Sequence, residues 1–168
     1  MDKLSKILFG AVITIFIILA IITIGAIYIF QKDGLISDDY STFPPEAKLI
    51  TNNQEYILSL EAYTWEVGNS VSGNKMEENI SVYALGQKKS PIEVNKKQMA
   101  KLQFIKHQEF KLEQIIAYLW RNENQKEKLK VKRNHTFILP NNPGNYVLEL
   151  NIKSNRGHVQ YVGKIIVK

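Results

Sequence analysis

The sequence contains no cysteine. Disulfide bonds are therefore excluded, and so is a lipid anchor that is attached through a cysteine side chain. Several enzyme motifs are missing as well, because the chain has no G-x-S-x-G nucleophile elbow, no P-loop and no dinucleotide-binding glycine pattern. These absences give no indication of catalysis.

Charged side chains are absent from residues 7–30, an apolar run of 24 residues. A helix rises ~1.5 Å per residue, so this run is long enough to cross the ~30 Å hydrocarbon core of a bilayer. Lys3 and Lys6 precede the run, whereas acids outnumber bases over residues 31–39. Because positive flanks stay on the cytoplasmic side, we predict a single-pass transmembrane helix in the cell membrane. Residues 1–6 would lie in the cytoplasm, and the C-terminal domain would be extracellular.

Two alternatives concern this apolar run. A cleaved signal peptide also begins with lysines, but its apolar core is usually ~7 to 15 residues long and ends at a small-x-small site. The small pair Gly25 and Ala26 is followed by four bulky residues, so a retained anchor is favoured. Small residues in the run also allow helix pairing in the membrane, but no clean GxxxG pattern occurs, so a monomeric tether is favoured.

The rest of the chain divides into a linker and one domain. The linker is predicted over residues 31–46, where Gly34 and the pair Pro44-Pro45 occur. Residues 47–168 are enough for one domain with its own core and too few for two ordinary domains. An external domain without cysteine fits Gram-positive surface proteins better than animal ectodomains.

Short runs of β-branched and aromatic residues follow the linker and alternate with turn residues. This pattern is typical of an antiparallel, all-β domain. Seven predicted strands suit a two-sheet sandwich. They cover residues 56–63, 80–85, 99–105, 115–120, 128–139, 146–154 and 159–167.

The last third gives the clearest strand pattern. Apolar and polar side chains alternate from Tyr146 to residue 153, and only Val147 interrupts the polar face, so the other face is predicted to enter a core. Gly157 ends the sequence Asn155-Arg156-Gly157, which predicts a hairpin loop whose glycine tolerates positive φ. Tyr146 follows a Pro-Gly turn, the place where immunoglobulin-like folds have their tyrosine corner.

Residues 112–120 fit two patterns. The apolar side chains are spaced as on an amphipathic helix, but Ile116, Tyr118 and Trp120 also alternate as in a strand. A strand is favoured because the sandwich would otherwise lack a central one. Trp120 is then expected in the core, whereas Trp65, at a strand end beside Tyr63, is the first candidate for a contact residue.

The reactive side chains in the sequence do not form the pattern of an enzyme. His107, His135 and His158 are far apart in the sequence and have no second ligand at zinc-site spacing. Ser72 and Lys75 satisfy S-x-x-K, but they are predicted in a Gly/Asn-rich loop, and the partner motifs of penicillin-binding enzymes are missing. We therefore predict no catalytic residue, no cofactor and no metal.

Charge is unevenly distributed along the chain. Residues 31–86 contain three lysines and nine acids, whereas residues 87–133 contain thirteen lysines and arginines and five acids. Near the end of the second stretch four lysines alternate with other residues, and a strand there would place them on one face, where they could attract a polyanion such as a teichoic acid. The alternative is that they protect an edge strand against aggregation. The residues concerned are Lys126, Lys128, Lys130 and Lys132, followed by Arg133. DNA binding is disfavoured by the predicted topology.

Several short motifs occur together in the domain. They are Tyr63-Thr64-Trp65, Leu102-Gln103-Phe104-Ile105, Trp120, Phe137-Ile138-Leu139-Pro140, Pro143-Gly144-Asn145-Tyr146 and the final run from Val159 to Val167. Over residues 55–168 they resemble a group of functionally uncharacterised surface proteins of low-GC Gram-positive bacteria. These are small and carry one immunoglobulin-like domain behind a lipid or helix anchor.

The resemblance implies a fold and a location but no activity. The implied fold is an all-β, immunoglobulin-like antiparallel β-sandwich preceded by one N-terminal transmembrane helix. Members of the group often have a cysteine where this chain has Thr64, so no shared disulfide or metal role carries over.

Two function classes follow from the sequence. The first is a non-catalytic extracellular binding module on a membrane anchor, which contacts an anionic envelope polymer or a protein partner through the Lys126 to Arg133 segment or the Tyr63-Trp65 end. The second is an accessory or regulatory subunit of a membrane protein complex, in which the helix pairs with a helix of another protein.

Overall fold

The computed structural model describes residues 14, 16–21, 23–25, 43–75, 80–105 and 110–168. The chain divides into two compact units, Met1–Asp39 and Tyr40–Lys168. The described residues of the first unit are helical. Their large apolar side chains, including Phe16 and Ile24, are exposed, and Thr23 Oγ1 donates a hydrogen bond to the Leu19 carbonyl at 2.8 Å.

Most of the predicted membrane segment lies outside the described residues. The same holds for the tip 1–6 and for residues 31–42 of the predicted linker. Within the part that is described, no helix combines the length and the apolar character that crossing a membrane requires.

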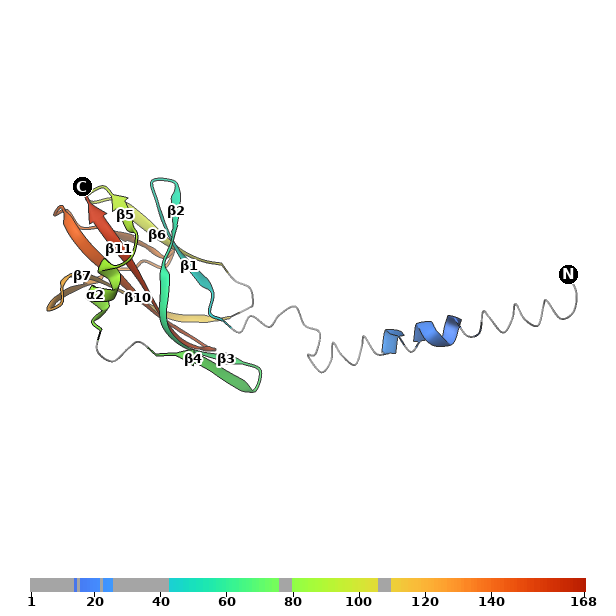
Figure 1. Cartoon of the computed structure of the whole chain (residues 1–168). Helices are drawn as coiled ribbons and strands as arrows, with labels where there is room; N and C mark the ends of the chain where they lie inside the picture. Colours follow the sequence, from blue (N-terminus) through green and yellow to red (C-terminus); the bar gives the residue numbers. More distant parts are fainter. Residues whose placement is uncertain (1–13, 15, 22, 26–42, 76–79, 106–109) are drawn as a thin grey trace, which may run out of the picture. The chain divides into compact units, whose positions relative to one another are not determined.

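The second unit is all-β, as predicted. Its described residues form eleven strands and one short helix (Figure 1). The strands are β1 Glu46–Thr51, β2 Gln54–Ile57, β3 Ser59–Val67, β4 Ser70–Asn74, β5 Pro91–Val94, β6 Met99–Ile105, β7 Leu112–Asn122, β8 Gln125–Leu129, β9 Thr136–Ile138, β10 Gly144–Ser154 and β11 Gly157–Val167, and the helix is α2 Val82–Gln87.

The strands form two sheets. One sheet has four strands in the order β2-β1-β6-β9, and the other has seven, in the order β4-β3-β11-β10-β7-β8 with β5 also beside β11. All pairs are antiparallel except β5 and β11. β3 pairs with the first half of β11 and β5 with the second half, so both strands lie along the same edge of β11.

The core contains side chains from both sheets, as expected for a sandwich. Leu49 and Leu102 come from the four-stranded sheet, and Leu148 and Tyr161 come from the seven-stranded sheet, and all four are almost fully buried. Along β10 every second residue enters this core, because side chains in a strand alternate between the two faces. We call the opposite face of the seven-stranded sheet the outer face.

Helix α2 corrects the predicted strand over residues 80–85. Ser81 caps it, since its side-chain oxygen accepts a hydrogen bond from the Ala84 amide at 3.1 Å. The helix lies against the outer face (Figure 1), and its Val82 packs there with Val147 and Val162. A Cβ at Gly86 would lie 2.2 Å from Val147 Cγ1, so this close approach requires glycine.

Other predicted elements are confirmed or revised. The strand over 99–105 is β6, and the ambiguous segment 112–120 is the strand β7 and not a helix. The predicted strand 56–63 is divided between β2 and β3, and the predicted strand 128–139 falls on β8 and β9, which belong to different sheets. Three strands, β1, β4 and β5, were not predicted. Together with the two divided strands and the one replaced by α2, they change the count from seven to eleven in the described residues.

The β10–β11 hairpin is confirmed in detail. Ser154 pairs with Gly157 across the turn, and Gly157 has φ of 141°. A Cβ at Gly157 would lie 1.9 Å from the Thr64 carbonyl oxygen of β3, so glycine also lets β3 approach. At the start of β10, the Tyr146 hydroxyl donates to the Asn142 carbonyl, four residues upstream, at 2.9 Å.

Candidate functional site

A buried carboxylate lies in the middle of the outer face. Glu149 on β10 is 5% exposed, and its neighbours in register are Tyr118 on β7 and Val162 on β11. Oε2 accepts a hydrogen bond from Trp120 Nε1 at 2.7 Å. Oε1 accepts two more, both at 2.8 Å, from Asn151 Nδ2 and Gln160 Nε2. Three N–H donors therefore offset the desolvation of this charge.

Sequence reasoning missed this cluster because Glu149 belongs to an ordinary polar face. The sequence did contain one indication that this face is partly covered, namely Val147, the one apolar residue on the polar face of β10. It is fully buried against α2, so part of the outer face is covered. A covered face makes any polar residue beside it a candidate for burial.

Lys126 lies over two aromatic rings near this cluster. Its Nζ is 4.5 Å from the Tyr118 ring centre and 4.6 Å from the Trp120 ring centre. The register explains this contact, because Lys126 pairs with Trp120 and Lys128 with Tyr118 across β7 and β8. Cation–π attraction therefore holds one lysine of the basic segment on the outer face.

The five predicted basic contact residues do not lie on one strand. Lys126 and Lys128 are on β8, whereas Lys130, Lys132 and Arg133 follow it in the connection to β9. The predicted strand face of four lysines is therefore wrong. All five side chains are exposed, and none of them forms a salt bridge with another described residue.

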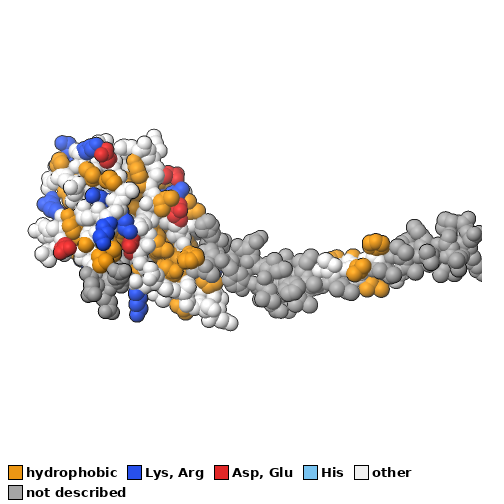
Figure 2. All heavy atoms as spheres, in the orientation of Figure 1, with side chains coloured by type: hydrophobic (Ala, Val, Ile, Leu, Met, Phe, Trp, Pro, Cys, Tyr) orange, Lys and Arg blue, Asp and Glu red, His pale blue; other side chains and the backbone are white. Residues whose placement is uncertain are grey.

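Two hollows with basic linings lie along this segment. One has a volume of about 360 Å³ and includes Arg121 and Lys126, together with the acid Glu127. The other has a volume of about 250 Å³ and includes Lys132 and Arg133, together with the acid Glu113. Over the face seen in Figure 2, basic and acidic side chains are both spread about, so the charge asymmetry of the sequence does not become a single patch there.

The burial of the two tryptophans differs from the prediction. Trp65 is 2% exposed and packs edge-on against Phe110 with ring centres 5.7 Å apart, so the prediction of an accessible Trp65 is wrong. Trp120, predicted in the core, is half-buried on the outer face. Tyr63 is partly buried and lies edge-on to Phe43 at 6.2 Å, and a contact role for it stays a prediction.

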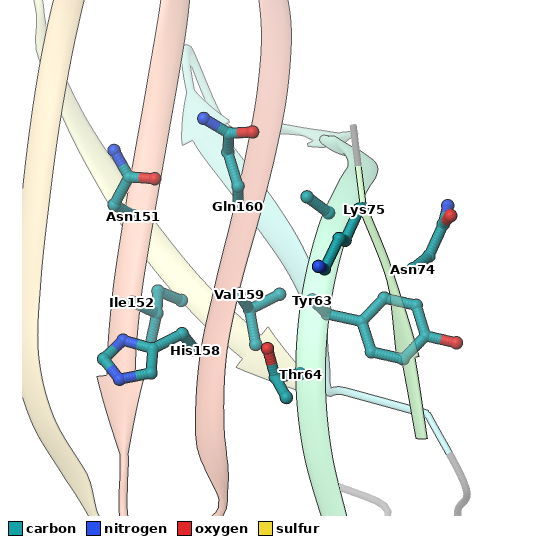
Figure 3. Close-up of a pocket in the computed structure, with 10 residues that line it drawn as sticks. Tyr63, Thr64, Asn74, Lys75, Asn151, Ile152, His158, Val159 and Gln160 are labelled. Carbon is teal, nitrogen blue, oxygen red and sulfur yellow. The ribbon is translucent and has the colours of Figure 1, made fainter. Parts of the chain in front are cut away.

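An open pocket of about 270 Å³ lies on the outer face near the β3–β11 pair (Figure 3). We call it the amide pocket, because two of its polar residues are Asn151 and Gln160, whose amides are bonded to Glu149. Tyr63 and Ala62 also contribute to the lining. The polar lining residues are Thr64, Asn74, Lys75, Asn151, His158 and Gln160.

The S-x-x-K motif begins on a strand and not in the predicted loop. Ser72 lies on β4, which ends at Asn74, just before Lys75, so the predicted loop is a strand. Ser72 Oγ donates to the Trp65 carbonyl at 3.3 Å, which links β4 to β3.

The histidines are distributed over different surfaces. His135 lies edge-on to Phe104 at 5.9 Å, His158 lies in the amide pocket, and His107 is outside the described residues. No group of three or more potential metal ligands occurs among the residues that are described.

Comparison with protein-family models and with curated proteins finds no match for this chain.

Proposed function

We propose that this chain is a non-catalytic extracellular binding module, held at the cell membrane by residues 7–30, and that its basic segment contacts an anionic polymer of the cell envelope. The basic segment consists of Lys126, Lys128, Lys130, Lys132 and Arg133. The observation that carries the proposal is that these five cations are exposed, close together in the chain and without an acidic partner among the described residues.

Four other lysines of the domain, Lys48, Lys89, Lys153 and Lys168, differ because they form salt bridges. Lys89 is paired with Glu61 at 2.6 Å and Lys153 with Glu113 at 3.2 Å. Cations that are already paired contribute little field at a distance, whereas unpaired ones attract a polyanion and steer its approach. The hollows at Arg121–Lys126 and at Lys132–Arg133 give such a polymer two places where cations border a depression.

We also propose that the domain has an immunoglobulin-like fold, and its strand order supports this proposal. The run β8-β7-β10-β11 corresponds to C′-C-F-G of that fold, and β1-β6-β9 corresponds to A-B-E. The bond from Tyr146 to Asn142 at the start of the penultimate strand has the geometry of a tyrosine corner. The strand C equivalent departs from the pattern, because its Trp120 lies on the outer face while Trp65 of β3 fills the core.

Membrane attachment is supported by the first unit. In the described part of its helix, the large side chains from Phe16 to Ile21 are 51–68% exposed and all apolar. A helix that is apolar around its whole circumference requires apolar surroundings. Hydrocarbon chains would supply them, which is consistent with the charge-free run 7–30.

The test of the polymer contact is cosedimentation of the intact chain, in detergent, with cell-wall fragments that retain or lack their anionic polymer. We expect binding to the retained form, and we expect it to weaken steeply as salt rises through the physiological range. The double variant Lys128→Glu with Lys130→Glu should bind at least about tenfold more weakly. Lys88→Glu with Lys96→Glu is the matched control, because it makes the same charge change at exposed positions outside the basic segment.

Equal binding to both wall preparations, or binding that salt does not affect, would refute the polymer contact. The accessory-subunit alternative predicts a different pattern. In that case a membrane protein copurifies with the intact chain and is lost when residues 7–30 are exchanged for an unrelated membrane helix, while the lysine variants retain it.

A further inference from the structure

The amide pocket is separate from the basic segment, since it lies at β3, β10 and β11 and not at β8. We propose that it binds a hydroxyl-rich ligand with one anionic group, that is, a sugar acid or a polyol phosphate. The hydroxyls would donate to the side-chain carbonyl oxygens of Asn151 and Gln160, and the anion would pair with Lys75.

The direction of the two amides follows from Glu149. A carboxylate accepts hydrogen bonds and does not donate them, so Asn151 and Gln160 must both turn their NH₂ groups toward it. Their carbonyl oxygens then point away from Glu149. Figure 3 shows both oxygens on the side of the pocket where Lys75 lies, with both nitrogens on the opposite side. The buried carboxylate therefore fixes two acceptors at the pocket.

Because the two side-chain amides cannot flip, their carbonyl oxygens favour a ligand that carries hydrogen-bond donors. Hydroxyl groups meet this requirement, and Thr64 adds a side-chain hydroxyl that can donate or accept. Inorganic phosphate carries only one or two P–OH donors beside its charged acceptor oxygens at neutral pH, so it matches the fixed carbonyl oxygens less well than a ligand with several hydroxyls does. The pair of amides thus favours a ligand with several hydroxyls over a bare anion.

Charge determines the second half of the ligand. Lys75 lines the pocket, and among the described residues no carboxylate lines it and none forms a salt bridge with Lys75. In Figure 3 its ammonium group points back toward β11. A cationic ligand is therefore disfavoured, and an anionic group beside Lys75 is favoured.

The size of the pocket limits the ligand to about one sugar unit. Its volume of about 270 Å³ is at the lower end of ligand pockets, which commonly hold ~300 to 1,000 Å³. A single sugar ring or a short polyol fits such a space, whereas a longer ligand would have to extend over the exposed surface.

The substitution Glu149→Gln tests the orientation argument. The new amide oxygen has to accept from Trp120, which has only a donor, so the new NH₂ faces Asn151 and Gln160. Both of these amides would then reverse and present their NH₂ groups to the pocket. All hydrogen bonds remain satisfied, so the fold is expected to be kept, while the pocket changes from accepting to donating. Glu149 acts here as a positioning residue.

The experiment measures dissociation constants of the intact chain in detergent by isothermal titration calorimetry. The probes are D-glucuronate, glycerol 3-phosphate, D-glucose and inorganic phosphate. We expect glucuronate or glycerol 3-phosphate to bind about tenfold more tightly than phosphate, and glucuronate about tenfold more tightly than glucose, because each reference lacks one of the two recognised groups. Tighter binding of glucuronate identifies a sugar acid, and tighter binding of glycerol 3-phosphate identifies a polyol phosphate.

Two variants separate the contributions. Lys75→Gln should remove the preference for glucuronate over glucose, with Lys88→Gln as the control. Glu149→Gln should bring glucuronate and phosphate to within about threefold of each other. Thermal unfolding reports whether the variant is folded, and Thr64→Val, which leaves Glu149 untouched, provides a second reduction in hydroxyl binding.

The proposal is overturned if neither hydroxylated anion binds the wild-type chain better than phosphate does. It is also overturned if the folded Glu149→Gln variant keeps the full wild-type preference for glucuronate over phosphate. Neither result affects the wall-binding test, which depends on the basic segment.

Discussion

Trp120 on β7 donates its indole N–H to Glu149 on β10 at 2.7 Å. This bond connects two neighbouring strands on the outer face, beside the place where α2 covers the sheet. Because Glu149 is 5% exposed, each of its donors matters more than a surface donor would. The tryptophan therefore has a polar role that its aromatic character alone does not indicate.

Replacing Trp120 by Phe should lower the free energy of unfolding by about 1–3 kcal/mol, because one oxygen of a buried carboxylate loses its only described partner. Chemical denaturation monitored by circular dichroism measures this change. The double variant with Glu149→Leu isolates the hydrogen bond, since removal of both partners leaves neither the carboxylate nor its indole donor. We expect a coupling free energy of about 0.5–3 kcal/mol, and strict additivity would contradict the assigned bond.

Sequence patterns predicted the strands in which apolar and polar side chains alternate clearly. β10 and β11 were located by alternation and by the Asn155-Arg156-Gly157 turn, and their register is continuous over the whole hairpin. β6 was predicted with its observed bounds, Met99–Ile105. In these segments the apolar residues that enter the core also produce the alternating pattern from which the strand is predicted.

The errors occur where distant residues determine the structure. β5 is only four residues long and gains its partner from the far end of the chain, in parallel pairing with β11. The segment at 80–85 has the composition of a strand, but the cap at Ser81 and the contact of Gly86 with Val147 make it a helix. Alternating lysines fit a strand and an extended connection equally well, so the end of β8 at Leu129 could not be predicted.

The candidate sites were predicted even less completely. The basic segment was identified by charge, but the amide pocket depends on which polar residues lie side by side across β10 and β11. Asn151 and Gln160 are directly opposite each other in that register. Such a pair becomes visible only after the strands have been aligned.

Substitution of Gly86 by Ala tests how closely α2 packs. Alanine favours a helix over glycine by about 1 kcal/mol, so local propensity alone predicts a gain in stability. The Cβ would, however, lie 2.2 Å from Val147 Cγ1, and we expect a net loss of about 1–3 kcal/mol in unfolding free energy. Adding Val147→Ala should recover part of that loss because it removes the clashing methyl groups. A stabilised single variant would show that α2 does not rest on Val147.

Trp65 should be one of the most sensitive positions in the domain. Its side chain is 2% exposed, so Trp65→Ala leaves a large cavity, and we expect a loss of about 3–5 kcal/mol in unfolding free energy. Val71→Thr is the control, because Val71 is 65% exposed and a near-isosteric change there should stay within about 0.5 kcal/mol. Denaturant midpoints at constant slope provide the measurement. A loss below that of the control would contradict a core position for Trp65.

Tyr161 should make the domain sensitive to alkali. Its hydroxyl is buried and donates to the Pro45 carbonyl, and burial raises its pKa above the ordinary value of 10.0. In the unfolded chain the group loses its proton near pH 10.0, whereas the folded protein keeps it, so the folded state binds more protons in this range. Stability contributed by Tyr161 is therefore complete below about pH 10 and decreases as pH rises above it.

The variant Tyr161→Phe tests this assignment. It should be less stable than wild type at neutral pH, because the hydrogen bond to Pro45 is lost. Its melting temperature should nevertheless fall less steeply than that of wild type between about pH 9 and 11, since the titrating group is gone. Tyr56→Phe controls for the loss of one tyrosine at a partly exposed position. If Tyr161→Phe and wild type lost stability in parallel over that range, the buried hydroxyl would not be the group responsible.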